Sequence, residues 1–559
     1  MSKLNPSDRR SGPRPTPAGP LRVTAATPTT TTHEGAPAYA HDPKTALFLL
    51  ATTSFWGEDS FYESADVRAE RFRSLVRDQA VGDPAWLTAF IGYLRGTANI
   101  RSGAIVAAAE MAKTRQENGL PGHVRQAVSA ALQRADEPGA IIHYYLTRYA
   151  TPRHERRLRG LTLPIALRRG VVDAVVRLYT EKSALKWDRP DAAVRFGDVV
   201  DLVEPAHATH GNAHLRGTPT GDLFRWLIER RHNRDNPIPA TLPILRARQR
   251  LMQVPVADRR SLLRAYGVNA TKTLAEAGMT HEALAGWLEG PLGATEWAMI
   301  LPTMGYMALL KNLANLDRAD VPDDIAAKVA ARLADPVQVA RSRQLPFRFL
   351  SAYSAVSSDR WATALGAAFE ASVGNIPHLT GRTLVLVDVS GSMRSRLSEH
   401  STMTRMMVGA LFGVVLAARG AKVDLHGFAD ATFHHDVPTG ASVLKSTQRF
   451  LERNNGGIYG HGTQIAAAIR ATYRGHDRVI VITDEQTSMR DHYYHGNVTD
   501  AVPRTVPLWC FNTSGETGAV VDAGTTNRYS MGGLSDTTFS LIPVLESGQA
   551  GRWPFDSAA

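Results

Sequence analysis

The pattern of apolar residues changes type near Gly381, and this change divides the chain into two kinds of fold. From about residue 41 to residue 372, apolar residues recur at spacings of three and four, which is typical of amphipathic helices. After Gly381, strand-like runs alternate with helix-like ones; the strand-like runs are T-L-V-L-V-D-V (383–389), K-V-D-L-H-G-F (422–428), R-V-I-V-I-T (478–483) and V-P-L-W-C-F (506–511). Because 559 residues are too many for one core, we expect separate domains.

The first part is predicted to be a stack of helices. The stretches 85–95, 104–113 and 124–134 are helix-like, and short turns such as V-G-D-P and E-N-G-L-P-G separate them. Short turns make consecutive helices antiparallel neighbours, so we predict an α-helical solenoid of HEAT-like pairs over residues 41–375. Residues 1–40 are rich in Pro and Thr and too polar to form a core, so we expect a disordered tail there.

The second part is predicted to be a Rossmann-like α/β domain over residues 376–559. Its strand-like runs alternate with predicted helices at 402–419, 441–453 and 463–474. This alternation indicates a parallel sheet covered by helices. In such a domain, ligands bind at the carboxyl ends of the strands.

Oxygen-bearing side chains occur at these strand ends. The first strand leads into Asp388, Ser390 and Ser392, Thr463 precedes a helix, and Asp484 follows the strand 478–483. Hydroxyl and carboxylate oxygens are ligands for hard cations, and Mg²⁺ suits a site that has few carboxylates and keeps bound water. We therefore predict a divalent cation site, best suited to Mg²⁺, formed by these five residues.

Two other interpretations of the same residues stay open. A Ser or Asp at a strand–helix junction often caps the following helix. A nucleophilic serine would need a base, for which His461 is the candidate, although the local sequence lacks the G-x-S-x-G pattern. Only the metal interpretation uses all three segments, each at a strand end, so we favour it over these two.

The net charge of +11 belongs to the first two-thirds of the chain. Residues 1–380 contain 48 Lys/Arg and 37 Asp/Glu, whereas residues 381–559 contain 16 of each. A positive charge placed in this way favours a polyanionic partner, with an ordinary basic surface as the alternative. No apolar run approaches the roughly 18 residues of a membrane span, no secretory signal is present, and there is a single cysteine. We expect a cytoplasmic protein without a membrane partner.

The five oxygen ligands resemble the metal-ion-dependent adhesion site of von Willebrand factor type A domains. That site has the pattern D-x-S-x-S, followed by a Thr and then an Asp, and all five positions are filled here. The resemblance implies that the serines and Thr463 contact the ion directly or through water. It also implies that an acidic group of a ligand completes the coordination shell. Because the resemblance implies binding and not catalysis, we expect no catalytic residue and a binding protein rather than an enzyme.

A basic helical region followed by such a domain resembles the Ro autoantigen family, in which a TROVE domain of HEAT-like repeats forms a ring. M-G-Y-M-A-L-L-K-N-L (304–313) is similar to the family's M-P-x-x-A-L-L-R-N-L, and Q-L-P-F-R-F-L (344–350) to its H-P-F-x-I-L stretch. The resemblance implies a monomeric ribonucleoprotein scaffold for noncoding RNA quality control. Such a protein holds a Y-like RNA on the outer surface of the ring and single-stranded 3′ ends of misfolded RNA in its hole.

The same resemblance implies partners and RNA-binding residues. An exoribonuclease or another protein is a possible ligand of the metal site, and the alternative is a protein-interaction scaffold to which RNA binding is incidental. Lys186 and Arg189 match a basic segment of the family's outer RNA surface, and Arg168 and Arg169 lie in a second basic cluster. We predict that these four residues bind RNA. Glu204 stands where the family has a His, and its carboxylate would repel phosphate.

Overall fold

The structure is a computed structural model of the 559-residue chain. It describes residues 28–32, 34–53, 64–149, 163–205, 213–342, 344, 346–356, 358–374, 376, 378–397, 401–420, 422–515, 518–522, 525–532, 539, 541–546 and 553–556.

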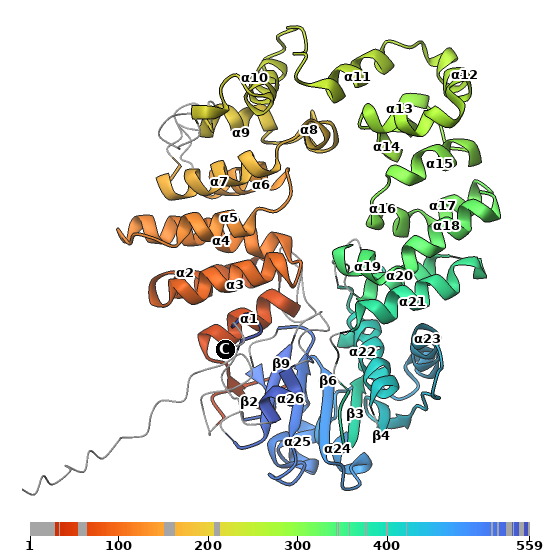
Figure 1. Ribbon diagram of the computed structural model, residues 1–559. Coiled ribbons are helices and arrows are strands. Elements are labelled where there is room, and N and C mark those ends of the chain that lie inside the picture. Colours follow the sequence, from red (N-terminus) through yellow and green to blue (C-terminus); the bar gives the residue numbers. More distant parts are fainter. Residues whose placement is uncertain are drawn as a thin grey trace, which may run out of the picture.

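The helices of the first part form two columns, which we call limb 1 and limb 2 (Figure 1). Limb 1 consists of α1 (Pro43–Thr53), α2 (Ala65–Gly82), α3 (Pro84–Gly96), α4 (Arg101–Glu117), α5 (Val124–Ala131), α6 (Glu137–Tyr149), α7 (Ile165–Leu178), α8 (Glu181–Trp187), α9 (Phe196–Val203) and α10 (Pro219–Arg231). Limb 2 consists of α11 (Pro243–Met252), α12 (Val256–Tyr266), α13 (Ala270–Glu276), α14 (His281–Leu288), α15 (Ala294–Ile300), α16 (Tyr306–Lys311), α17 (Leu313–Arg318), α18 (Asp323–Ala334), α19 (Pro336–Ser342), α20 (Pro346–Ala355) and α21 (Ala362–Ser372).

These helices begin and pack as the sequence pattern predicts. The helix-like stretches 85–95 and 104–113 fall in α3 and α4, and the stretch 124–134 begins with α5 but extends three residues beyond its end at Ala131. Helix α3 begins with Pro84 directly after Asp83, whose carboxylate accepts the Trp86 N–H at 3.0 Å and so caps the helix. The helical prediction for the first part is therefore confirmed. Among the described residues, no helix is both long and apolar enough to cross a lipid bilayer.

The two limbs have separate hydrophobic cores, and the division falls inside α11. Leu245 belongs to the buried cluster that runs through limb 1, whereas Leu251, less than two turns later, belongs to the cluster of limb 2. The limb 2 cluster continues without a break into one side of the C-terminal sheet. Limb 2 and the C-terminal domain therefore share a core, and limb 1 is a separate packing unit.

The C-terminal domain contains a six-stranded sheet in the order β5-β4-β3-β6-β7-β9. All neighbouring pairs are parallel except β4 and β5. The strands are β3 (Arg382–Asp388), β4 (Lys422–Phe428), β5 (Thr432–His434), β6 (Arg478–Thr483), β7 (Leu508–Asn512) and β9 (Arg528–Gly532), and the helices are α22 (Arg405–Arg419), α23 (Val443–Arg453), α24 (Ile465–Thr472), α25 (Met489–His495) and α26 (Leu541–Glu546). The predicted α/β class is confirmed.

Successive residues of the central strands are buried on opposite faces of this sheet. Val385 and Val387 pack with α22 in the core shared with limb 2, while Leu384 and Leu386 pack with α24 in a second cluster. This alternation follows from the two-residue period of a strand, and burial on both faces explains the continuous apolar runs in the sequence. The one cysteine, Cys510 in β7, is fully buried, as its apolar surroundings predict.

The segment before α1 is ordered from residue 28, so the prediction of a disordered tail is wrong for residues 28–40 apart from residue 33, which lies outside the described residues. Strands β1 (Thr30–Thr31) and β2 (Pro37–Ala40) pair with each other, and β2 also pairs with β8 (Gly518–Ala519) of the C-terminal domain. This contact joins residues almost 480 positions apart, and composition alone gives no sign of such a pairing. Residues 1–27 of the predicted tail lie outside the described residues.

The C-terminal segment closes the molecule by packing on limb 1, so that the chain forms a closed loop (Figure 1). The Trp553 ring lies 5.6 Å from Phe48 and 4.9 Å from Trp86, and the Phe555 ring lies 5.4 Å from Tyr93. Trp553 is a member of the limb 1 core and only 6% exposed. Offset and edge-on ring pairs at these distances each stabilise packing beyond simple burial, so this aromatic cluster fastens limb 1 to the C-terminal end of the chain.

We expect Trp553→Ala to weaken the contact between limb 1 and the C-terminal segment. Truncating a buried Trp costs about 3–5 kcal/mol, and here the loss falls on the contact between limb 1 and the rest of the molecule. Hydrogen–deuterium exchange should speed up in α1 and α3. Trp361→Ala is the control, because Trp361 is fully buried in limb 2. Equal exchange in α1 and α3 for the two variants would contradict this role of Trp553.

Candidate metal centre and nucleic-acid interface

The five predicted metal ligands come together at the carboxyl edge of the sheet. Asp388 ends β3 and Ser390 and Ser392 follow it, Thr463 precedes α24, and Asp484 follows β6, the strand next to β3. All five are buried, with exposed fractions of 5% or less. The parallel order of the strands places these loops side by side, as the sequence predicts.

Hydrogen bonds hold the first loop in shape. The Asp388 carboxylate accepts the Ser390 N–H at 2.8 Å through Oδ1 and the Thr483 hydroxyl at 2.6 Å through Oδ2. The hydroxyls of Ser390 and Ser392 lie 3.3 Å apart. These contacts turn two hydroxyls and one carboxylate toward a common region at the end of β3.

Asp430 organises the loop that carries Thr463, and sequence reasoning missed this residue. Its carboxylate accepts the N–H groups of His461 and Gly462 at 3.0 and 3.2 Å and the Gln464 side-chain amide at 2.9 Å. Burial raises the pKa of Asp430, but these hydrogen bonds outweigh it and bring the pKa below its usual value. A carboxylate two residues beyond β4, at the same edge of the sheet, was the signal that could have identified it.

Two further hydrogen bonds fix the Thr463 loop against the other two loops. The Gly391 N–H donates to the His461 carbonyl at 3.0 Å, which ties the loop to the one that carries the serines. The Thr463 carbonyl accepts the Thr487 hydroxyl at 3.2 Å, which ties it to the segment after Asp484. The three segments are therefore one connected unit.

The two carboxylates of this edge repel each other. Burial, together with the nearby charge of Asp484, raises the pKa of Asp388 to about 7, although the hydrogen bonds from Thr483 and Ser390 oppose the rise. Glu485 is also fully buried, and burial raises its pKa to about 8. Buried carboxylates close together at this edge of the sheet are electrostatically suited to a cation, which would offset the repulsion between them.

The donor set fits a hard cation. Its side-chain donors are two carboxylates and three hydroxyls, so every donor atom is oxygen. Without water, these five groups are fewer than the six to eight oxygen ligands that Ca²⁺ takes. Among the described residues, no group of three His, Cys, Asp or Glu side chains could hold a metal ion, so a cation at this edge needs the hydroxyls as well.

A large groove lies between the two limbs in the helical part. Its volume is about 1390 Å³, and its lining comes from α3, the start of α4, the α5–α6 region and α8 in limb 1 and from α14, α16 and α19 in limb 2. The lining residues include seven Lys/Arg and four Asp/Glu: Arg95, Arg101, Arg134, Lys186, Arg189, Arg195 and Lys311 against Asp136, Asp188, Asp191 and Glu282. The groove is therefore basic, and it exists only because the two limbs face each other.

The two lysines of the groove differ from its arginines in their pairing. Most of the arginines are already neutralised, for example Arg95 by Glu137 at 2.7 Å and Arg189 by Asp191 at 2.5 Å. Lys186 in limb 1 and Lys311 in limb 2 are exposed, and within the described part of the chain neither forms an ion pair with a carboxylate. These two ammonium groups are the cations most available to a ligand in the groove.

Local structure explains how Lys186, Trp187 and Arg189 reach the groove. Helix α8 ends at Trp187, and the next residue, Asp188, is buried and accepts the Phe196 N–H at 2.9 Å. This anchor turns the flanking side chains outward. The centre of the Trp187 ring lies 4.5 Å from the Arg134 guanidinium and 4.8 Å from the Lys186 ammonium, so two cations contact a partly exposed indole.

The four predicted RNA-binding residues do not form one surface. Lys186 and Arg189 line the groove between the limbs, which differs from the outer surface that the resemblance implies. Arg168 and Arg169 lie on α7, outside the lining of the groove. Arg168 donates to the Glu204 carboxylate at 3.1 Å, so Glu204 neutralises this arginine, whereas Arg169 is exposed.

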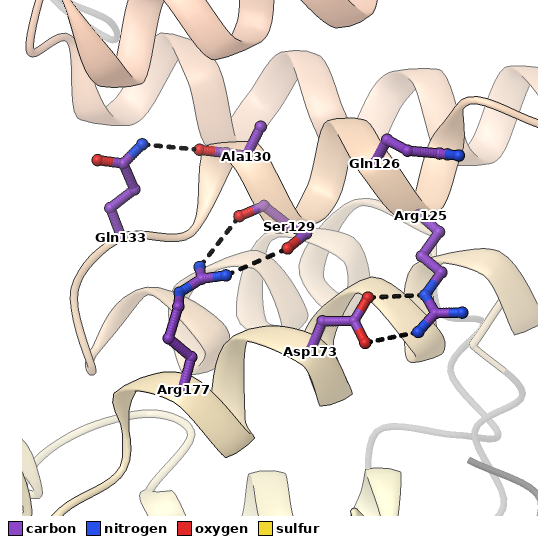
Figure 2. A pocket seen from close by; sticks show the side chains of 7 residues that line it. All are labelled: Arg125, Gln126, Ser129, Ala130, Gln133, Asp173 and Arg177. Carbon is purple, nitrogen blue, oxygen red and sulfur yellow. Dashed lines mark hydrogen bonds and ion pairs between the residues drawn. The ribbon is translucent and has the colours of Figure 1, made fainter. Parts of the chain in front are cut away.

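A second pocket, of about 740 Å³, lies between α5 and α7 (Figure 2). Both of its arginines already have partners. Arg125 forms a two-point contact with Asp173 at 2.7 and 2.8 Å, and Arg177 donates to the hydroxyl and carbonyl of Ser129 at 3.3 and 3.2 Å. An anion would have to displace these contacts, so this pocket is a weaker candidate than the groove.

Comparisons with known proteins agree with this architecture. Residues 293–360 match the model of the TROVE domain, and they include both stretches that carry the resemblance in limb 2. The solved structure of the Ro (RSR) protein of Deinococcus radiodurans matches with a TM-score of 0.57 and 16% identity, over 89% of this chain and 99% of that one. The chain has the fold of a Ro protein. No curated protein matches the sequence significantly.

The Ro fold accounts for the closed loop and the groove. The match extends over nearly the whole length of both chains, so it includes the helical limbs and the C-terminal domain together. What sequence reasoning missed is Lys311, although it lies within the matched stretch 304–313. Its role depends on facing Lys186 from the other limb, and local sequence carries no information about that distance.

We expect Asp484→Asn to stabilise the C-terminal domain when divalent cations are absent. Asn keeps the shape of the side chain but removes one of the two repelling charges. A gain of roughly 1 kcal/mol would raise the melting temperature by about 2–4 °C for a domain of this size. Differential scanning calorimetry in EDTA measures this. Asp388→Asn is the matched variant and should gain less, because the Asp388 carboxylate accepts two hydrogen bonds. A lower melting temperature for Asp484→Asn would contradict the repulsion.

Proposed function

We propose that this protein binds RNA and holds a single-stranded segment in the groove between its limbs. The observation that carries the proposal is a pair of exposed lysines, Lys186 and Lys311, which line one basic groove and form no ion pair with a carboxylate among the described residues. The Trp187 ring, which contacts two cations, lies in the same groove. Cations contact the phosphates, and aromatic rings stack with unpaired bases, in proteins that bind single strands without strict sequence preference. The TROVE match and the Ro fold support the same proposal.

The shape of this site supports a finer role. A single strand can present its bases to side chains inside a groove, whereas an A-form duplex is recognised from outside by its shape. We therefore propose that the groove takes unpaired 3′ ends of misfolded noncoding RNA, while a structured, Y-like RNA contacts the outer surface, with Arg169 as one contact. The protein would act as a monomeric, cytoplasmic scaffold in RNA quality control.

The C-terminal domain would supply a second binding site. Asp388, Ser390, Ser392, Thr463 and Asp484 would hold a divalent cation, for which Mg²⁺ is the best candidate, and the cation would take up an acidic side chain of a partner protein such as an exoribonuclease. We propose a binding role without catalysis. In support, within the described residues the side chain of His461 makes no hydrogen bond to Ser390 or Ser392, which a nucleophile and its base would need.

A protein-interaction scaffold to which RNA is incidental is the second candidate. The observation that favours it is a pair of exposed tyrosines on α25, the helix that follows the metal loop. Tyr493 and Tyr494 are 79% and 68% exposed and lie edge to face at 5.1 Å. Tyrosine is enriched at protein interfaces, so these rings could contact a partner held by the cation.

We expect Lys186→Ala/Lys311→Ala to weaken RNA binding. Each phosphate contact with a single strand contributes about 0.7 to the slope of log K against log salt, so the double variant should lose about 1.4 of that slope and bind roughly 10–30-fold more weakly at 0.1 M salt. Fluorescence anisotropy with a 3′-labelled single-stranded RNA, measured over a range of salt concentrations, tests this.

The control for that experiment is Lys272→Ala/Lys328→Ala. These lysines are exposed, pair with carboxylates on their own helices and lie outside the groove lining, so the net charge changes equally while the groove is unaltered. Arg168→Ala/Arg169→Ala should affect single-stranded RNA less than the groove variant does. Equal losses in the groove and control variants, or wild-type binding no tighter than to heparin, would refute the RNA proposal.

We expect Mg²⁺ binding to depend on the five ligands and on Asp430. Asp388→Ala should abolish binding, and Asp430→Ala should weaken it about 10–100-fold, as is typical for residues that orient metal ligands. Isothermal titration calorimetry of EDTA-treated protein with MgCl₂ measures both. Asp436→Ala is the control, because this carboxylate is 83% exposed and pairs with His434. Unchanged Mg²⁺ affinity in Asp388→Ala would rule out the site.

A further inference from the structure

A small pocket opens beside the groove, between helices α16, α17 and α20 of limb 2. Its volume is about 170 Å³, and its lining is Met307, Leu310, Lys311, Leu313, Ala314, Arg348, Ser351, Ala352, Ala355 and Val356. Met307 and Lys311 also line the groove, so the two spaces share a wall. The pocket therefore adjoins the space in which a chain in the groove would lie.

The size of the pocket limits what it can hold. Pockets for complete small-molecule ligands measure about 300–1000 Å³, and 170 Å³ is well below that range. The pocket is suited to one protruding group of a larger molecule that is held elsewhere. The neighbouring groove, about eight times larger, is the place where that molecule would lie.

The lining has the chemistry of a site for a flat, weakly polar ring attached to an anionic chain. Leu310 and Leu313 are buried and form apolar walls, and the alanines at positions 314, 352 and 355 leave the space between them. Lys311 and Arg348 are exposed cations, and among the described residues neither forms an ion pair with a carboxylate. The lining contains no acidic residue. This charge pattern favours a polyanion over a protein partner.

We propose that this pocket receives one unpaired nucleobase of a single-stranded RNA that lies in the groove. The inference rests on the proposed RNA-binding function and adds a base-binding subsite to it. The planar guanidinium of Arg348 can stack on a base, and the thioether of Met307 makes favourable contacts with aromatic rings. The Ser351 hydroxyl can donate to or accept from the edge of the base. Lys311, shared with the groove, contacts the adjacent phosphate.

A walk of single abasic sites along a 12-nucleotide single-stranded RNA tests the proposal. In the wild-type protein, one position of the abasic site along the RNA should weaken binding at least about fivefold, because the missing base is then the one that the pocket would hold. A fivefold loss is about the lower end of what stacking of one base contributes to affinity. Abasic sites elsewhere should have smaller effects. The abasic site keeps every phosphate, so the salt dependence should stay the same.

Ala355→Phe closes the pocket in this experiment, and Ser354→Phe is its matched control. Both residues are exposed on α20, but only Ala355 lines the pocket, so both variants add the same ring at a surface position. Ala355→Phe should bind the intact RNA at least about fivefold more weakly and lose its sensitivity to the abasic register. Ser354→Phe should behave as wild type. Arg348→Gln, which leaves the space open, should reduce the abasic effect without removing salt-dependent binding.

The outcomes separate this inference from the function on which it rests. Salt-dependent RNA binding with no abasic-sensitive register would overturn the subsite and leave the RNA function standing. Sensitivity that persists unchanged in Ala355→Phe and Arg348→Gln would also overturn it, because the base would then lie elsewhere. A complete lack of RNA binding would refute both. A protein peptide that binds the pocket and leaves RNA binding unaffected would overturn the subsite alone.

Discussion

The packing of the C-terminal segment on limb 1 is the contact on which the shape of this molecule depends. Limb 1 has its own hydrophobic core, separate from the core that limb 2 shares with the α/β domain. Covalent continuity through α11 joins the limbs at one end only. The aromatic contacts of Trp553 and Phe555, together with the pairing of β2 and β8, fix the other end. Without that closure, the distance between the limbs, and so the width of the groove, would not be defined.

The distribution of ion pairs gives the groove its chemistry. A basic surface whose arginines are all held by carboxylates has little to offer a phosphate, because each existing contact must be broken first. The α5–α7 pocket is similar, since Arg125 is held by the Asp173 carboxylate and Arg177 by the hydroxyl and carbonyl of Ser129. In the groove, the paired arginines build the walls, while Lys186 and Lys311 keep their charges available. Net charge therefore predicts a polyanion partner, whereas the pattern of ion pairs predicts which basic surface is available to it.

Sequence reasoning succeeded where local pattern determines structure and failed where distant segments meet. The strand runs 383–389 and 478–483 and the ligand positions that follow them could be predicted, because a parallel sheet brings its strand ends together. The strand β2 (Pro37–Ala40) could not be predicted, since it depends on pairing with β8. Lys186 was predicted from the resemblance of its segment to a family motif, but its place in a groove shared with Lys311 depends on how the two limbs are closed together. Asp430 was missed because its role is to bind backbone amides of another loop.

The contact between limb 1 and the α/β domain and the candidate metal site both involve the short segment that follows β7. Arg68 and Arg71 of α2 donate to the carbonyls of Ser514 and Gly515, respectively, just after β7, and these contacts belong to the junction between limb 1 and the α/β domain. The Ser514 hydroxyl in turn donates to the Asp484 carbonyl at 3.4 Å. A partner captured by a cation at Asp484 would therefore be held beside the junction that sets the spacing of the limbs. None of the five candidate metal ligands lines the groove, so each site can be altered by mutation without removing the other.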